Sequence, residues 1–198
     1  MTSIVVSDIC ERIHDNTTIR VAYLYCNIRM QREQKVDDLL ANLLKQLAQG
    51  QRSLPSSVED LYKQHKKKET LQSLHQTSIA LRSVIRMYKR VFIIVDALDE
   101  CQTSNRTGFL SELFSIQKEV QKVNILVTSR FIPEIVDQFK NSPRLEIRAD
   151  SRDVARYLEG HIQQLPSFVR QNRQLQQEIK KGIVETVDGM YVPSEYLK

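Results

Sequence analysis

Long hydrophobic runs are missing from this 198-residue sequence, and with them the signature of a membrane protein. Its longest apolar stretches fall far short of the roughly 18 residues that a membrane-spanning helix requires. The first residues also lack the basic region followed by an apolar region that marks a secretory signal. We therefore expect an intracellular, cytoplasmic protein with no membrane partner.

Cysteine and histidine are too few and too scattered for a disulfide framework or a zinc site. The three cysteines, Cys10, Cys26 and Cys101, are odd in number and form no C-x-x-C pair. The four histidines show no H-E-x-x-H spacing, and Ser129 lacks the glycines of a nucleophile elbow. We expect reduced, packed thiols, and hydrolase chemistry by serine or cysteine has little support.

The charge balance is mildly basic, with a net charge of +5 and a pI of about 9.1. Such a charge permits weak attraction to nucleic acid but does not demonstrate it. The densest basic cluster, at residues 65–68, has no interleaved aromatic residues, which favours a solvated loop. We expect no specific nucleic-acid partner, because no reading helix or aromatic platform is visible.

One apolar stretch, Val91–Val95, is followed by three carboxylates within five residues. Its β-branched residues predict a strand that is buried on both faces, as in a parallel sheet. The acids Asp96, Asp99 and Glu100 then lie at its carboxyl end, where ligands bind in open α/β sheets. Asp96 is placed to hold magnesium, directly or through water. Alternatively, Asp96 and Asp99 only start a turn and cap the next helix.

A second apolar stretch, Asn124–Thr128, predicts another buried strand, with Thr128, Ser129 and Arg130 at its end. The acid-rich stretch resembles a Walker B motif, and the form Asp96-Ala-Leu-Asp-Glu100 resembles the NACHT domains of signal-transducing P-loop NTPases. Within them it is most similar to the nephrocystin-3-like N-terminal type. The resemblance covers nearly the whole chain, from about Ser3 to Val192.

The resemblance implies roles for these residues. Asp96 would be the metal residue, and Glu100 or Asp99 would orient the attacking water, with Asp99 as a supporting acid. Thr128, Ser129 and Arg130 would end the sensor 1 strand beside the bound cofactor. The implied cofactors are magnesium and ATP or GTP in the intact parent protein, with none secure for this chain alone.

The predicted fold class is α/β, a partial doubly wound parallel sheet of the P-loop NTPase type followed by the start of a helical subdomain. We place a nucleotide-binding domain at residues 1–150 and the helical subdomain at 151–198.

The expected strands are Val21–Cys26, Val91–Val95, Asn124–Thr128 and Leu145–Arg148. The expected helices are Ser3–Ile13, Leu39–Leu47, Leu71–Tyr88, Phe109–Val120, one beginning at Pro133, one beginning at Ser151, and Leu175–Val187. Between them we expect loops at Gln49–Glu69, with at most a short helical piece at Val58–Tyr62, and at Cys101–Thr107.

The family's glycine-rich phosphate loop, G-x-x-x-x-G-K-[ST], is absent from the sequence, which contains only five glycines. In the family this loop directly precedes the helix that here starts near Met1. The strand that leads into this loop is then missing too. It is strand 1 in the family's sheet, whose strands lie in the order 5-1-4-3-2. Strand 4 would lose a neighbour and expose unpaired backbone groups. We expect a fragment of a longer parent with flanking effector and repeat domains, poorly stable alone and prone to self-association.

Two functions from different classes stay open. The first is a nucleotide-dependent conformational switch reset by hydrolysis. The second is a degenerate interaction or scaffold module that keeps the fold without turning over nucleotide. The first is favoured for the intact parent, and the second for these 198 residues alone.

Overall fold

The computed structural model describes residues 2–30, 34–68, 74–147, 151–162, 165–188 and 194–197. It divides into two compact units. The first contains Met1–Arg144 and Glu195–Lys198, and the second contains Leu145–Ser194. None of the helices within the described ranges is both long and apolar enough to cross a membrane.

Three parallel strands form the centre of the first unit: β1 (Ile19–Tyr25), β2 (Arg90–Asp96) and β3 (Val123–Ser129). The register pairs Tyr25 with Asp96 and Val95 with Val127. Since parallel strands place their carboxyl ends at one edge, the residues after all three strands gather there. The predicted α/β class is therefore confirmed.

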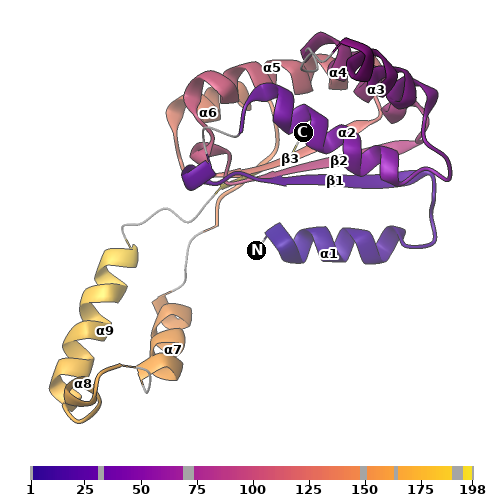
Figure 1. Ribbon diagram of the computed structural model, residues 1–198. Coiled ribbons are helices and arrows are strands. Elements are labelled where there is room, and N and C mark those ends of the chain that lie inside the picture. Colours follow the sequence, from indigo (N-terminus) through magenta and orange to yellow (C-terminus); the bar gives the residue numbers. More distant parts are fainter. Residues whose placement is uncertain are drawn as a thin grey trace. The chain divides into compact units, whose positions relative to one another are not determined.

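Helices cover both faces of the parallel strands. Figure 1 shows α1 (Thr2–Ile13) on one face and, on the other, α2 (Val36–Gln49), α3 (Ser56–Lys68), α4 (Leu74–Arg86), α5 (Thr103–Val120) and α6 (Pro133–Gln138). The larger core lies under α2, α4 and α5, where Leu40, Leu81 and Phe109 are fully buried. Under α1 a smaller cluster joins Val6 to Ile94 and Leu126. The predicted helical stripes thus supply the apolar faces that cover the sheet.

The loop expected over Gln49–Glu69 was wrong, because α3 occupies Ser56–Lys68. The Pro55 carbonyl accepts hydrogen bonds from the amides of Val58 and Glu59, which begins the helix. Leu61 is buried and contributes to the core, and Lys63 pairs with Glu59 one turn away. The burial of Leu61 and the i,i+4 ion pair therefore both favour a helix in this polar segment. The basic cluster at residues 65–68 ends this helix and does not form the solvated loop that we expected.

Helix α5 also begins earlier than expected. The polar stretch Cys101–Thr107 was predicted to be a loop, but the helix starts at Thr103, and the Arg106 amide donates to the Gln102 carbonyl at 2.8 Å. Arg106 is only 7% exposed, so this first turn packs against the protein interior. Burial against the core therefore overrides the weak helix propensity of Thr, Ser and Asn.

The expected gap beside β3 is filled. The sheet has five strands in the order β1-β2-β3-β5-β4, where β4 is Arg144–Leu145 and β5 is Ser194–Leu197. Our prediction that β3 exposes an unpaired edge was wrong, because β5 hydrogen-bonds beside it. The strand expected at Leu145–Arg148 is shorter, and Arg148 lies outside the described residues. Residues 189–192, where the family resemblance ends, lie outside the described residues as well.

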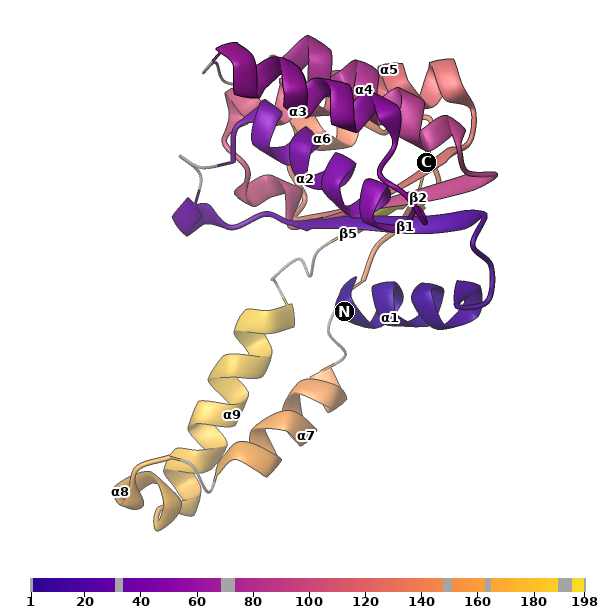
Figure 2. The same ribbon diagram turned by 45° about the vertical axis from the view of Figure 1, so that its right-hand side comes forward.

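The second unit contains α7 (Ser151–His161), α8 (Ser167–Arg170) and α9 (Arg173–Asp188). Figures 1 and 2 both show α7 and α9 side by side, and Lys180 of α9 forms an ion pair with Glu159 of α7 at 3.1 Å. The two predicted helices are present, while the short α8 between them was not predicted. Its amides at Val169 and Arg170 bond to the Pro166 carbonyl, which begins this short turn.

Candidate functional site

Asp96, the last residue of β2, accepts hydrogen bonds from two hydroxyl groups. The Thr128 hydroxyl, from β3, donates to its Oδ1 at 2.5 Å. The Thr2 hydroxyl, at the start of α1, donates to the same oxygen. Thr2 is 4% exposed and Thr128 is 2% exposed, so both hydroxyls reach Asp96 from buried positions. The Asp96 carboxylate at the end of β2 therefore links this strand to β3 and to the start of α1.

The chain turns sharply after Asp96. Ala97 adopts a left-handed conformation with φ 51°, which an alanine seldom takes, and the short helix η2 (Leu98–Glu100) follows. The Ala97 amide donates to the Thr128 hydroxyl oxygen at 3.0 Å, and Leu98 is fully buried. This bond and the burial of Leu98 hold the unusual turn between β2 and η2.

Asp99 is held by the end of β3. Its Oδ1 accepts from the Arg130 amide at 3.1 Å, and its Oδ2 pairs with the Arg130 guanidinium at 2.5 Å. The Asp99 side chain is 4% exposed and that of Arg130 is 63% exposed. The hydrogen bond and charge of Asp99 raise the pKa of Arg130 above its ordinary value. Arg130 is therefore fixed as the cationic partner of a buried carboxylate.

Glu100, although adjacent to Asp99, is hydrogen-bonded to a different segment of the chain. Its Oε2 accepts a hydrogen bond from the Ile28 amide at 3.0 Å, in the segment that follows β1. Asp99 and Glu100 thus lie between the ends of β1 and β3, and each is oriented by the segment that follows a different one of these strands. Ser129 differs from both, because it is fully buried and its hydroxyl donates to the Arg130 carbonyl at 2.7 Å. The structure thus brings the side chains of Asp96 and Thr128 together, whereas the Ser129 hydroxyl bonds to the backbone.

Two thiols lie beside these acids. Cys26 follows β1 and Cys101 follows η2, and both are buried. Hydrogen bonding between the two sulfurs lowers the pKa of Cys101, with the charge of Arg106 acting in the same direction against the opposing effect of burial. The same contact, together with burial, raises the pKa of Cys26. The two buried thiols therefore have pKa values that are displaced in opposite directions.

Within the described residues, no three His, Cys, Asp or Glu side chains converge to form a metal site by themselves. The oxygen atoms of Thr2 and Asp96 nevertheless suit magnesium. Magnesium prefers oxygen ligands and is held in nucleotide sites by one or two protein groups together with phosphate and water. A threonine hydroxyl at a helix start, in contact with a carboxylate at a strand end, matches that requirement.

The family comparison covers this whole arrangement. The family described as Nephrocystin 3, N-terminal matches residues 2–130, which is well over half of the chain. This chain belongs to that family. The matched nephrocystin 3 N-terminal region begins at Thr2, ends at Arg130 and includes every residue of the site described above. Comparison with curated proteins finds no match.

Sequence reasoning missed Thr2, although the signal was present. In a nephrocystin 3 N-terminal region we expected a glycine-rich loop ending in Lys followed by Ser or Thr just before the first helix. Thr2 is the first residue of α1, the helix that we expected to follow this loop. Its contact with Asp96 spans 94 positions of sequence, so only the fold reveals it.

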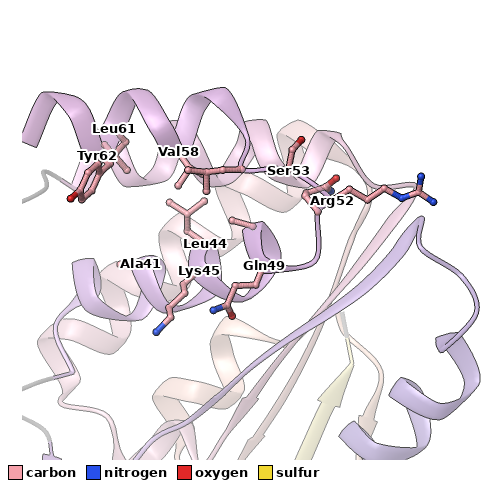
Figure 3. A pocket seen from close by; sticks show the side chains of 12 residues that line it. Ala41, Leu44, Lys45, Gln49, Arg52, Ser53, Val58, Leu61 and Tyr62 are labelled. Atoms are coloured by element: carbon pink, nitrogen blue, oxygen red, sulfur yellow. The ribbon is translucent and has the colours of Figure 1, made fainter.

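A separate pocket of about 460 Å³ lies between α2 and α3. Figure 3 shows Leu44 of α2 facing Val58 of α3, while the charged ends of Lys45 and Arg52 point away from the cavity. None of the predicted site residues lines it. This pocket therefore takes no part in the arrangement around Asp96.

Proposed function

We propose that this chain contributes the magnesium and water-orienting residues of a NACHT-type, nucleotide-dependent signalling switch with a P-loop NTPase fold. The observation that carries the proposal is the contact between the Thr2 hydroxyl and the Asp96 carboxylate. In P-loop NTPases, magnesium is held by the Ser or Thr that ends the phosphate loop and by the acid that ends the Walker B strand. Family membership supports this assignment but does not test it.

Thr2 and Asp96 would hold magnesium, and Thr128 would orient Asp96 through its hydroxyl. Bound magnesium would supply positive charge that neutralises the phosphates of ATP or GTP. In the strand numbering of the P-loop fold, β1, β2 and β3 would be strands 2, 3 and 4. The position that β5 occupies would then be that of strand 1.

Glu100 is the residue we assign to orienting the attacking water. Its Oε2 is fixed by the Ile28 amide, so the carboxylate has a defined direction at the strand ends. A carboxylate in this position can accept the proton that water loses during attack. Asp99 then acts as a supporting acid, because it positions Arg130 and, through the Arg130 amide, the end of β3.

Arg130 would sense the terminal phosphate, with Ser129 and Thr128 shaping the strand end beneath it. The Arg130 side chain remains 63% exposed while paired to Asp99, so it can face a ligand without leaving its partner. The parent switch would also act through flanking effector and repeat domains.

The Asp99–Arg130 pair also favours a second candidate function, an interaction or scaffold module without nucleotide turnover. In that case the ion pair serves only to fasten η2 to β3, and the carboxylates have no ligand. The two functions differ in whether loss of the Thr2 hydroxyl or of the Asp96 charge changes nucleotide binding.

The test uses a chimera in which a family-type glycine-rich loop is joined ahead of Thr2, because the given sequence contains no such loop. Thr2→Val and Asp96→Asn should weaken magnesium-dependent binding of a fluorescent ATP or GTP analogue about tenfold or more, since each removes a magnesium ligand. Thr2→Ser is the matched control and should retain binding, because it keeps the hydroxyl. The unmodified chain should bind weakly or not at all.

Glu100→Gln in the same chimera separates the two roles. Binding should remain nearly unchanged, while single-turnover hydrolysis slows about a hundredfold or more, because an amide cannot take up the proton. Hydrolysis at the wild-type rate in the double variant Glu100→Gln and Asp99→Asn would overturn the catalytic assignment. If Thr2→Val and Thr2→Ser bind equally well, the magnesium assignment is wrong.

A further inference from the structure

Arg106 is a buried cation on the face of α5 that packs against the sheet. The buried residues of this helix recur at helical spacing, and the first of them is charged: Arg106, Phe109, Leu110, Leu113, Ile116 and Val120. The apolar members belong to the larger core, whereas Arg106 is 7% exposed at the end of the stripe. Because side chains on a helix lean toward its N-terminus, Arg106 extends toward the start of α5, at the carboxyl edge of the sheet.

No residue in the described ranges forms an ion pair or a side-chain hydrogen bond with Arg106. Arg82 of α4 is the contrasting case, since its side chain is 14% exposed and pairs with Glu112 and Glu119, each at 2.8 Å. A buried cation that has lost water without gaining a counter-charge is strongly unfavourable. Arg106 therefore needs an anion that the described part of the protein does not supply.

The start of α5 needs an anion as well. Gln102, at the N-cap, forms no side-chain cap hydrogen bond, and the first turn contains no acid. The first intrahelical bond runs from the Arg106 amide to the Gln102 carbonyl at 2.8 Å, so the amides of residues 103–105 precede it and have no partner inside the helix. These amides carry the positive end of the helix dipole, to which Arg106 adds charge of the same sign. One anion at this place would stabilise both.

The neighbouring helix does not provide that anion. The Asn105 side-chain amide donates to the Gln34 carbonyl at 3.1 Å, which brings the start of α5 beside the start of α2. The first turn of α2 has its own acids, Asp37 and Asp38, which complement the dipole of α2. Neither of them pairs with Arg106 within the part of the chain that the structure describes. The unbalanced positive charge therefore lies at α5 and not at α2.

We propose that the start of α5 is a phosphate-binding site, in which the Arg106 guanidinium and the amides of residues 103–105 contact one phosphate group. A helix N-terminus presents backbone donors to an oxyanion, and a guanidinium presents a fork of donors that matches phosphate oxygens. Free phosphate and the phosphate of a nucleotide offer the same chemistry, and the experiment separates these two sources.

The phosphate site goes beyond the proposed nucleotide function and does not rest on it. It uses none of the residues that we assign to magnesium or to the attacking water, namely Thr2, Asp96 and Glu100. Phosphate binding can therefore be measured on the full chain in the presence of EDTA, where magnesium is removed. Failure of the magnesium assignment would leave this measurement unchanged.

The experiment follows thermal melting of the full chain while phosphate replaces chloride at constant ionic strength. At a tenfold excess of phosphate over its dissociation constant, the melting temperature should rise by about 4 °C and then approach saturation. Arg106→Met should lose this saturable rise and keep only the gradual stabilisation that phosphate gives to proteins in general. Arg90→Met is the matched control, because Arg90 is exposed and begins β2 at the opposite edge of the sheet. It should respond like the wild-type chain.

A second measurement does not depend on how well the variant folds. Equilibrium dialysis of the wild-type chain against radiolabelled phosphate should show one phosphate per chain, which sulfate displaces and chloride does not. In phosphate-free buffer, Arg106→Met should melt at or above the wild-type temperature, since it removes an unpaired buried cation. Absence of saturable phosphate binding by the wild-type chain would overturn the proposal, and so would equal phosphate responses of Arg106→Met and Arg90→Met.

The source of the phosphate is read from the chimera that carries a restored glycine-rich loop. If the bound group belongs to a nucleotide, Arg106→Met should weaken binding of the fluorescent nucleotide analogue about tenfold, and inorganic phosphate should compete with the analogue. If the site takes free phosphate, nucleotide binding should be the same in Arg106→Met and in Arg90→Met. Either result supports a phosphate site at α5, provided that dialysis of the wild-type chain shows saturable binding.

Discussion

Asp99 and Glu100 show how far neighbouring residues can differ in role. Both follow the same strand, and the sequence predicted that both would lie at its carboxyl end. In the fold, Arg130 holds Asp99 and the Ile28 amide holds Glu100. The position of both acids could be predicted, because it follows from recognising the buried strand and the direction in which the chain runs along it. Their partners could not, because Ile28 and Arg130 belong to segments that follow other strands.

Thr2 and the two thiols illustrate the same limit. Thr128 could be placed near Asp96, since it ends the adjacent strand predicted from the family resemblance. Thr2 contacts Asp96 only because α1 lies against the sheet face that carries Ile94 and Leu126. Cys26 follows β1 and Cys101 follows η2, and both are buried in the same core cluster. Contacts of this kind depend on packing, which the spacing of residues along the chain does not specify.

The first stability prediction concerns the Asp99–Arg130 pair. Arg130→Met should lower the free energy of unfolding by about 1 kcal/mol, because it leaves a carboxylate that is 4% exposed without its cation. Arg12→Met is the matched control, since Arg12 pairs with Asp8 at 2.8 Å while both side chains are more than half exposed. That change should leave the free energy of unfolding nearly unchanged, because exposed ion pairs contribute little to stability. Urea denaturation followed by circular dichroism measures both, and equal losses would contradict the assigned role of burial.

At the scale of elements, apolar periodicity predicted the helices that carry a continuous stripe. Helix α2, with Leu40, Leu43 and Leu47 fully buried, is one of these. Helix α3 was missed because its apolar face consists of little more than Val58 and Leu61 within a strongly polar sequence. A helix that is held by a few tertiary contacts and local ion pairs has too weak a pattern to be recognised from sequence.

The second stability prediction concerns the bond that fastens the end of α2. The hydroxyl of Tyr88, a residue 2% exposed, donates to the Leu47 carbonyl at 2.7 Å. Tyr88→Phe keeps the ring but removes this donor, so it should lower the free energy of unfolding by about 1 kcal/mol. Tyr62→Phe, at a residue 61% exposed, is the control and should change it by less than about 0.5 kcal/mol. Thermal melting compares the two variants. Equal melting midpoints would refute the stabilising role of this hydrogen bond.

At the scale of the whole molecule, the sheet differs most from its prediction. The family order led us to expect an open position beside β3, and the missing strand was assigned to a segment ahead of Thr2. The structure instead places β5, Ser194–Leu197, in that position, between β3 and β4. Four residues after a Pro give almost no strand signal in the sequence, and their partner β3 lies about 70 positions earlier. Such distant segments pair because buried backbone N–H and C=O groups need hydrogen-bond partners.

The position of β5 leads to the final prediction, which compares chains ending at Leu197 and at Pro193. The first keeps β5 and the second lacks it, so β3 loses the neighbour that pairs with its outer backbone groups. Because an unpaired, apolar strand edge pairs readily with another chain, the shorter protein should melt at a lower temperature and elute as larger species as its concentration rises. The longer chain should behave like the full-length protein, which makes it the control for shortening as such. Size-exclusion chromatography with light scattering, together with thermal melting, measures both properties. If the two chains share one melting temperature and both elute as monomers, β5 does not protect the edge of β3, and the closure of the sheet must come from another segment.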